Sequence, residues 1–264
     1  MTRRLHIISA LGISLLIGCA TWRAAPQLPV GNSMVLDQLV VFSDSPLPRH
    51  HRLLEELRAL RTTVSTKLQL PISDEPIHVY LFSTADKFEA FFRTYHPTLP
   101  RRRAFFVETD TRLSAYAYWG DRVAEDLRHE VVHGYLHAVV PNLPLWLDEG
   151  LAEYFEVPRG MDGVNRPHVQ QLVAQGVDWR PDIVRLEQLT TTAEMTQLDY
   201  AESWAWVHLM LETSPQNRTV LQSYLQSLIQ MAPPQPLSIS LRQVDPGCQQ
   251  HLANHLKTLN QGLQ

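Results

Sequence analysis

The chain has few features that could cross-link it or carry it through a membrane. Only two cysteines, Cys19 and Cys248, occur in 264 residues, too few for the disulfide framework of a small secreted scaffold. The main apolar run, residues 7–17, is shorter than the ~20 residues of a membrane-spanning helix. A net charge of −4 gives no reason to expect nucleic acid as a partner. With 44% hydrophobic residues, the chain is expected to fold around an apolar core.

The first residues have the pattern of an export signal. Two arginines precede the apolar run, which ends in Leu16-Ile17-Gly18-Cys19. This segment resembles a bacterial lipoprotein signal, which implies cleavage before Cys19, acylation of that cysteine and stable membrane attachment through several acyl chains. An ordinary secretory signal cut near Ala20 or Ala25, or an uncleaved anchor, is the alternative. Either way the protein is expected to be exported. If Cys19 is acylated, Ala20 and Thr21 stand where an aspartate would favour the inner membrane, so the resemblance implies the periplasmic side of the outer membrane in a Gram-negative cell.

A His-Glu-x-x-His motif spans residues 129–133. Residues four apart lie on the same face of a helix, so His129 and His133 can direct their imidazoles at one metal ion. Glu130 lies roughly 100° around the helix, off the metal but close enough to take a proton from a nearby water molecule. This division of labour is typical of zinc hydrolysis. The alternative is a core helix with incidental histidines.

A second helix is expected to supply the third ligand. Pro141 ends the first helix and Pro144 suits the start of the next, so the two helices must pack as neighbours. In the segment 145–155, LWLDEGLAEYF, Glu149 can complete a His₂Glu ligand set for one zinc ion per chain. Glu149, Glu153 and residue Glu156 share a helical face, which in the alternative interpretation is only a solvated acidic surface.

Together, these two motifs resemble the gluzincin branch of zinc metallopeptidases. They are most similar to the bacterial peptidase MA-like domains of largely unknown function, also filed as DUF1570. The resemblance implies zinc ligands His129, His133 and Glu149, with Glu130 as general base. It further implies that Glu153, one turn after Glu149, orients a ligand histidine. The Tyr-x-x-Ser-Trp segment at 200–204 resembles part of the same domains, so Tyr200 is a candidate donor to the oxyanion, or alternatively a packing residue.

The rest of the sequence predicts an α+β chain of zincin-like type. Residues 1–18 are assigned to the signal, 19–32 to a tether, and 33–264 to one domain: a sheet lobe (33–120), the active-site helices (121–157) and a mainly helical lobe (158–264). Strands are expected at 34–42, 77–82, 103–107 and 113–119. Helices are expected at 50–70, from Ser83 to 95, from Asp121 to 140, at 165–175, 181–189, from Asp199 to 212, and at 249–259.

Two segments near the motif helix have open interpretations. In zincins a sheet edge pairs with an extended substrate, so Ala115, Tyr116, Ala117 and Tyr118 are candidate substrate-binding residues, or simply a buried strand. The run at 101–103, three arginines, is expected to be a solvated loop, with a carboxylate-binding patch as the alternative.

The expected function is therefore hydrolysis of peptide bonds by an exported, lipid-anchored zinc metallopeptidase. Its partners would be a peptide or protein substrate and the membrane that holds the lipid. Two alternatives remain: an envelope lipoprotein that zinc only stabilises and that binds a partner, and a zinc amidase acting on cell-wall peptide.

Overall fold

The computed structural model describes residues 25–48 and 50–263. The segment predicted to be a signal and the predicted lipidation site, Cys19, lie outside these residues. No helix among those described is long and apolar enough to cross a membrane. Cys248 is buried and forms no disulfide within the described part.

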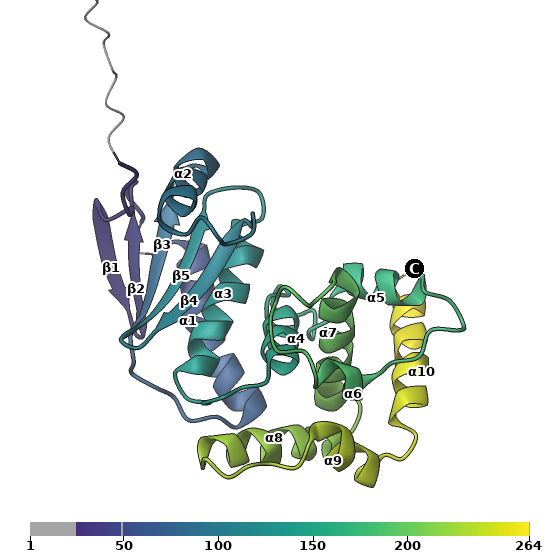
Figure 1. Ribbon diagram of the computed structural model, residues 1–264. Coiled ribbons are helices and arrows are strands. Elements are labelled where there is room, and N and C mark those ends of the chain that lie inside the picture. Colours follow the sequence, from purple (N-terminus) through teal and green to yellow (C-terminus); the bar gives the residue numbers. More distant parts are fainter. Residues whose placement is uncertain (1–24, 49, 264) are drawn as a thin grey trace, which may run out of the picture.

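A five-stranded mixed sheet forms the N-terminal half of the molecule (Figure 1). Its strands are β1 (Asn32–Leu36), β2 (Leu39–Ser43), β3 (Ile77–Phe82), β4 (Ala104–Thr109) and β5 (Arg112–Tyr118). They lie in the order β1-β2-β3-β5-β4. The three central strands are parallel, and each outer strand is antiparallel to its neighbour. β5 is therefore paired on both sides, and β4 and β1 are the two edge strands.

Strand alternation gives this sheet two different faces. Ile77, Val79 and Leu81 pack with the leucines of α1 (Arg52–Leu68) and with α3 (Val123–His137) in the main core. Tyr80 and Phe82 point the other way, into an aromatic cluster with α2 (Ala85–Tyr95). The helix that carries the His-Glu-x-x-His motif is thus held against a rigid sheet.

Helices make up the C-terminal half (Figure 1). They are α4 (Leu145–Phe155), α5 (Arg166–Val173), α6 (Ile183–Leu186), α7 (Gln197–Glu212), α8 (Pro215–Ile229), α9 (Leu237–Val244) and α10 (Cys248–Gly262). α4 packs against both α3 and α7 and so connects the two halves. Arg128 of α3 reinforces this connection: its Nη1 donates to Glu56 of α1 (3.0 Å), and its Nε donates to the carbonyl of Glu156 at the end of α4.

Several predicted elements differ in the structure. The strand expected at 34–42 is a hairpin, because Asp37 adopts a left-handed conformation (φ 51°) that turns the chain. Helices expected to begin at Ser83, Asp121 and Asp199 have Thr84, Arg122 and Thr196 as N-caps. Asp199 instead completes a capping box with Thr196. α8 and α9 were not predicted.

Candidate metal centre

The two motif histidines and Glu149 come together at the junction of α3 and α4. The Nε2 atom of His129 lies 3.5 Å from Glu149 Oε2, and the Nε2 atom of His133 lies 3.8 Å from the same oxygen. Ligands bound at about 2.0–2.1 Å in a tetrahedral zinc site are roughly 3.3 Å apart. The three predicted ligands therefore have nearly the spacing that one zinc ion requires.

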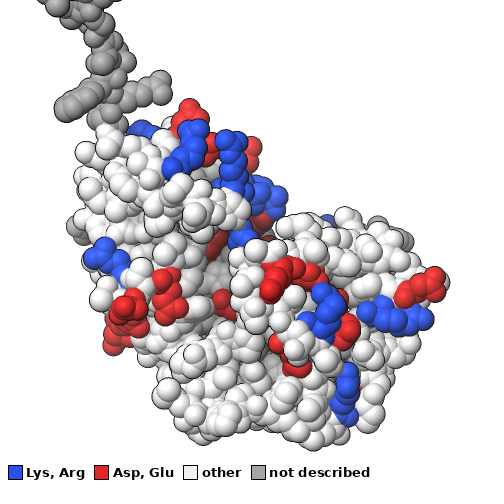
Figure 2. Space-filling view, in the orientation of Figure 1, with Lys and Arg blue, Asp and Glu red and all other residues white. Residues whose placement is uncertain are grey.

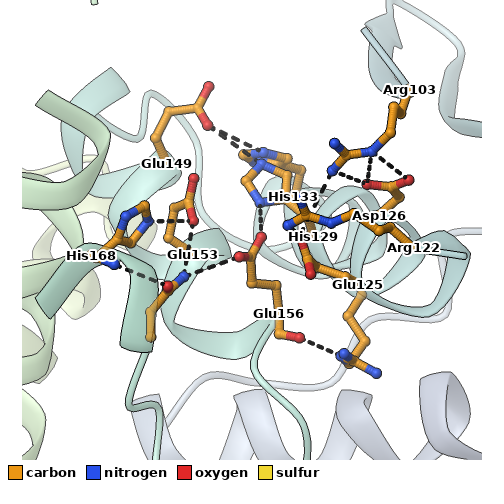
Figure 3. A network of polar contacts seen from close by, with 12 residues as sticks. Arg103, Arg122, Glu125, Asp126, His129, His133, Glu149, Glu153, Glu156 and His168 are labelled. Atoms are coloured by element: carbon orange, nitrogen blue, oxygen red, sulfur yellow. Dashed lines mark hydrogen bonds and ion pairs between the residues drawn. The ribbon is translucent and has the colours of Figure 1, made fainter. Parts of the chain in front are cut away.

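The opposite nitrogen of each histidine is bound by a different carboxylate. His129 Nδ1 lies 2.9 Å from Glu156 Oε2, and His133 Nδ1 lies 2.9 Å from Asp148 Oδ1. In each ring the Nδ1 atom thus faces its carboxylate partner, and the Nε2 atom faces Glu149 (Figure 3). Metal-binding histidines commonly have such carboxylate partners, which fix the ring and its tautomer.

The charges around the rings also suit a cation. Burial alone would lower the pKa of His129, but hydrogen bonds to Glu149 and Glu156 raise it well above its ordinary value. The pKa of His133 is likewise raised, mainly by Asp148, against the effect of burial. A negative potential that favours a proton on these rings also favours a dication, provided that the metal displaces the proton. The donor set therefore fits zinc both in geometry and in charge.

Glu153 is engaged differently from the prediction. Its Oε2 lies 2.7 Å from His168 Nε2 of α5, and Asn165 Nδ2 lies 3.4 Å from the same oxygen. The carboxylate bound to His129 is that of Glu156, two turns of helix after Glu149. The acidic face 149–156 was recognised in the sequence, but the choice between its members depends on His168, which comes from another helix.

Glu130 lines a large cleft beside the candidate metal centre and is half-buried. The cleft has a volume of about 1340 Å³ and is bounded by the loop before β4, by α3 and α4, and by α5 and the start of α7. Burial raises the pKa of Glu130 above its ordinary value, although His129 and His133 act in the opposite direction. A carboxylate with a raised pKa is a stronger base, as proton abstraction requires.

Tyr200, at the first turn of α7, faces the same cleft. Its hydroxyl oxygen accepts a hydrogen bond from Arg102 Nη2 (3.1 Å). Burial and the nearby charge of Glu149 raise the pKa of Tyr200, so its phenol stays protonated at neutral pH. The hydroxyl hydrogen is not used in that bond and can be donated elsewhere. The Arg102 contact was not predicted, since the two residues are far apart in the sequence.

The predicted substrate strand does not lie at the sheet edge. Ala115, Tyr116, Ala117 and Tyr118 belong to β5, which pairs with β3 and with β4. Of the two interpretations left open, the pairing supports the buried strand, because β5 inserts parallel to β3 and leaves β4 outside. β4 also lies close to the candidate metal centre, since the ring of Phe106 stacks 5.7 Å from that of His133. An extended ligand would therefore pair with β4.

Comparison with known families gives one match. Residues 123–235 match a family model described as "Protein of unknown function (DUF1570)", and no curated protein matches the chain. The matched segment begins with α3 and ends shortly after α8, so it contains both histidines, Glu130, Glu149 and Tyr200. The sheet lies outside it. The predicted similarity to DUF1570 is thus confirmed for the part of the chain that carries the candidate metal centre.

Proposed function

We propose that this protein is an exported, lipid-anchored zinc metallopeptidase with a zincin-like fold. The observation that carries the proposal is the convergence of His129 Nε2, His133 Nε2 and Glu149 Oε2, with each histidine fixed by its own carboxylate. Glu130 and an open cleft adjoin these atoms. Access to the cleft favours turnover over a zinc ion that only stabilises the fold, because structural zinc sites are closed.

Each residue has a distinct part in this reaction. His129, His133 and Glu149 would hold the zinc ion, which when bound polarises a carbonyl group and lowers the pKa of water. Glu130 accepts the proton of the attacking water and delivers it to the leaving amine. Tyr200 donates its hydroxyl hydrogen to the developing oxyanion, since Arg102 occupies the phenolic oxygen as a donor. The edge strand β4 offers free backbone groups to an extended peptide.

Metal analysis and peptide cleavage together test this proposal. We expect about one zinc per chain in protein lacking residues 1–19, and loss of that zinc in His133→Ala. Glu130→Gln should keep the zinc and cleave peptides roughly 10²–10⁴-fold more slowly. An active Glu130→Gln protein would refute the assigned base. Absence of zinc from both the parent and His133→Ala after reconstitution would refute the metallopeptidase.

A further inference from the structure

Arginines, and no lysines, line the candidate active-site cleft. Two of them form ion pairs with carboxylates. The Nη2 atom of Arg103 lies 2.8 Å from Asp126 Oδ1, and Arg122 pairs with Glu125. Five others form no ion pair within the described residues, namely Arg93, Arg101, Arg102, Arg159 and Arg166. Figure 2 shows basic side chains gathered along the rim of the hollow between the two halves of the molecule.

Most carboxylates of the cleft are already engaged. Glu125 and Asp126 bind arginines, Glu153 binds His168, and Glu156 binds His129. Glu149 faces the two histidines. In the described part of the cleft only Glu89 and Glu130 form neither an ion pair nor a contact with the candidate metal ligands. The seven arginines and seven carboxylates of the lining balance in formal charge when the histidines are neutral. A bound zinc ion would therefore make the cleft positive, and the five arginines without an ion-pair partner stay available to an anionic ligand.

Among the unpaired arginines, Arg102 contacts a proposed active-site residue, Tyr200. Its hydrogen bond to Tyr200 uses one of the five N–H donors of the guanidinium and holds the group over the cleft. Arg102 and Glu130 line the same cleft, and the positive charge of Arg102 acts on the carboxylate of Glu130. A guanidinium with free, parallel N–H groups matches the geometry of a carboxylate.

We propose that the substrate carries a carboxylate next to the scissile bond and that Arg102 is the specificity-determining residue that binds it. The inference rests on the proposed peptidase function. The carboxylate comes either from an acidic side chain or from the C-terminus of a peptide. Nearby unpaired arginines at the rim attract the same ligand from solution.

Equilibrium binding tests the inference without turnover. Full-length Glu130→Gln protein is titrated with fluorescent peptides that differ only in having Glu, Gln or Lys at the positions around the bond to be cleaved. A parallel set is amidated, which separates a side-chain carboxylate from a terminal one. We expect the acidic or free-acid peptide to bind roughly tenfold more tightly than its neutral partner, with a difference that falls as salt is raised.

Four further variants identify the group responsible. In the Glu130→Gln background, Arg102→Gln should abolish the preference and Arg102→Glu should reverse it toward the Lys peptide. Tyr200→Phe removes the hydrogen bond but keeps the cation, so the preference should remain. Arg242→Gln, an exposed arginine of α9, should behave as the parent. Equal binding of Glu and Gln peptides, or a preference that persists in Arg102→Gln, would overturn the inference.

Failure of this inference is distinguishable from failure of the proposed function. If zinc is bound and neutral peptides are cleaved as well as acidic ones, the peptidase stands and the carboxylate preference is wrong. If no peptide is cleaved but acidic peptides still bind through Arg102, the peptidase is wrong and the carboxylate site remains.

Discussion

At the scale of single residues, the notable feature is that each motif histidine has two different carboxylate neighbours. His129 lies between Glu149 and Glu156, and His133 lies between Glu149 and Asp148. The carboxylate at Nδ1 makes the imidazole more electron-rich and fixes its direction, while the one at Nε2 belongs to the other candidate ligand, Glu149. Asp148 reaches further, because its second oxygen lies 3.0 Å from His137 Nε2. The candidate metal centre is therefore supported by residues outside the candidate ligand set.

Comparison of Glu156→Gln with Glu153→Gln tests this support. Glu156→Gln removes the negative charge at His129 Nδ1, so zinc affinity should fall by roughly 10–100-fold. Glu153→Gln should have a smaller effect, because the carboxylate of Glu153 is bound to His168. Competition with a chromophoric chelator measures both affinities. Equal losses in the two variants would mean that Glu153 also orients the ligand histidines.

At the scale of elements, the closeness of α4 and α7 depends on a glycine. A Cβ atom at Gly150 would lie 2.6 Å from the carbonyl oxygen and 2.8 Å from the carbonyl carbon of Ser203 on α7. These are backbone atoms, which cannot rotate away. At Gly134 of α3 a Cβ atom would lie 2.9 Å from side-chain atoms of Ile77 on β3, and those atoms have more freedom to move. Of the two helices that carry the candidate ligands, α3 is thus packed closely against β3, and α4 is packed closely against α7.

Gly150→Ala should consequently destabilise the protein more than Gly134→Ala. We expect a loss of about 1–3 kcal/mol in the free energy of unfolding for Gly150→Ala, since a helix must shift to relieve the clash. Gly134→Ala should cost less, because repacking of Ile77 and the higher helix propensity of alanine offset part of the strain. Urea unfolding of the two variants gives both values. A larger loss for Gly134→Ala would show that β3 and α3 tolerate less movement than α4 and α7.

At the scale of the whole molecule, the last helix closes the C-terminal half. α10 packs against α5 and α7. The Nε2 atom of His255 in α10 lies 2.9 Å from the Nδ1 atom of the buried His208 in α7. Burial, and the neighbouring His255, lower the pKa of His208 to about 4. An unfolded histidine has a pKa near 6.5. Between these values the unfolded chain binds a proton that folded His208 does not.

Stability should therefore decrease as the solution is acidified below about pH 6.5. The effect of His208 on the free energy of unfolding begins at about pH 6.5, where the unfolded chain starts to bind the proton. The free energy of unfolding should fall by about 3 kcal/mol in total by about pH 4. Free energies of unfolding measured from pH 4 to pH 7 should fall less steeply in His208→Gln than in the parent. His50→Gln, at a residue whose side chain is 93% exposed, serves as the control. Parallel curves for the parent and His208→Gln would contradict this origin of acid sensitivity.

The pattern of apolar and polar residues within short segments was sufficient to predict much of the fold. The leucine spacing of α1, the apolar run of β3 and the hairpin of β4 and β5 are properties of short segments, and the structure confirms them. The candidate ligands were equally predictable, because the four-residue spacing of His129 and His133 is fixed by one turn of helix. The starts of helices were less predictable, because the observed N-caps Thr84, Arg122 and Thr196 each lie close to another residue that could cap the helix.

The amino-acid sequence alone thus determined the two motif helices, the convergence of His129, His133 and Glu149, and the α+β class, since each follows from spacing along the chain. Tertiary structure decided the position of β4 at the sheet edge, the pairing of Glu156 with His129, and the contact between Arg102 and Tyr200. These depend on strand order and on helices brought together from distant segments. Periodicity contains no information about either, because it describes only which face of an element is buried.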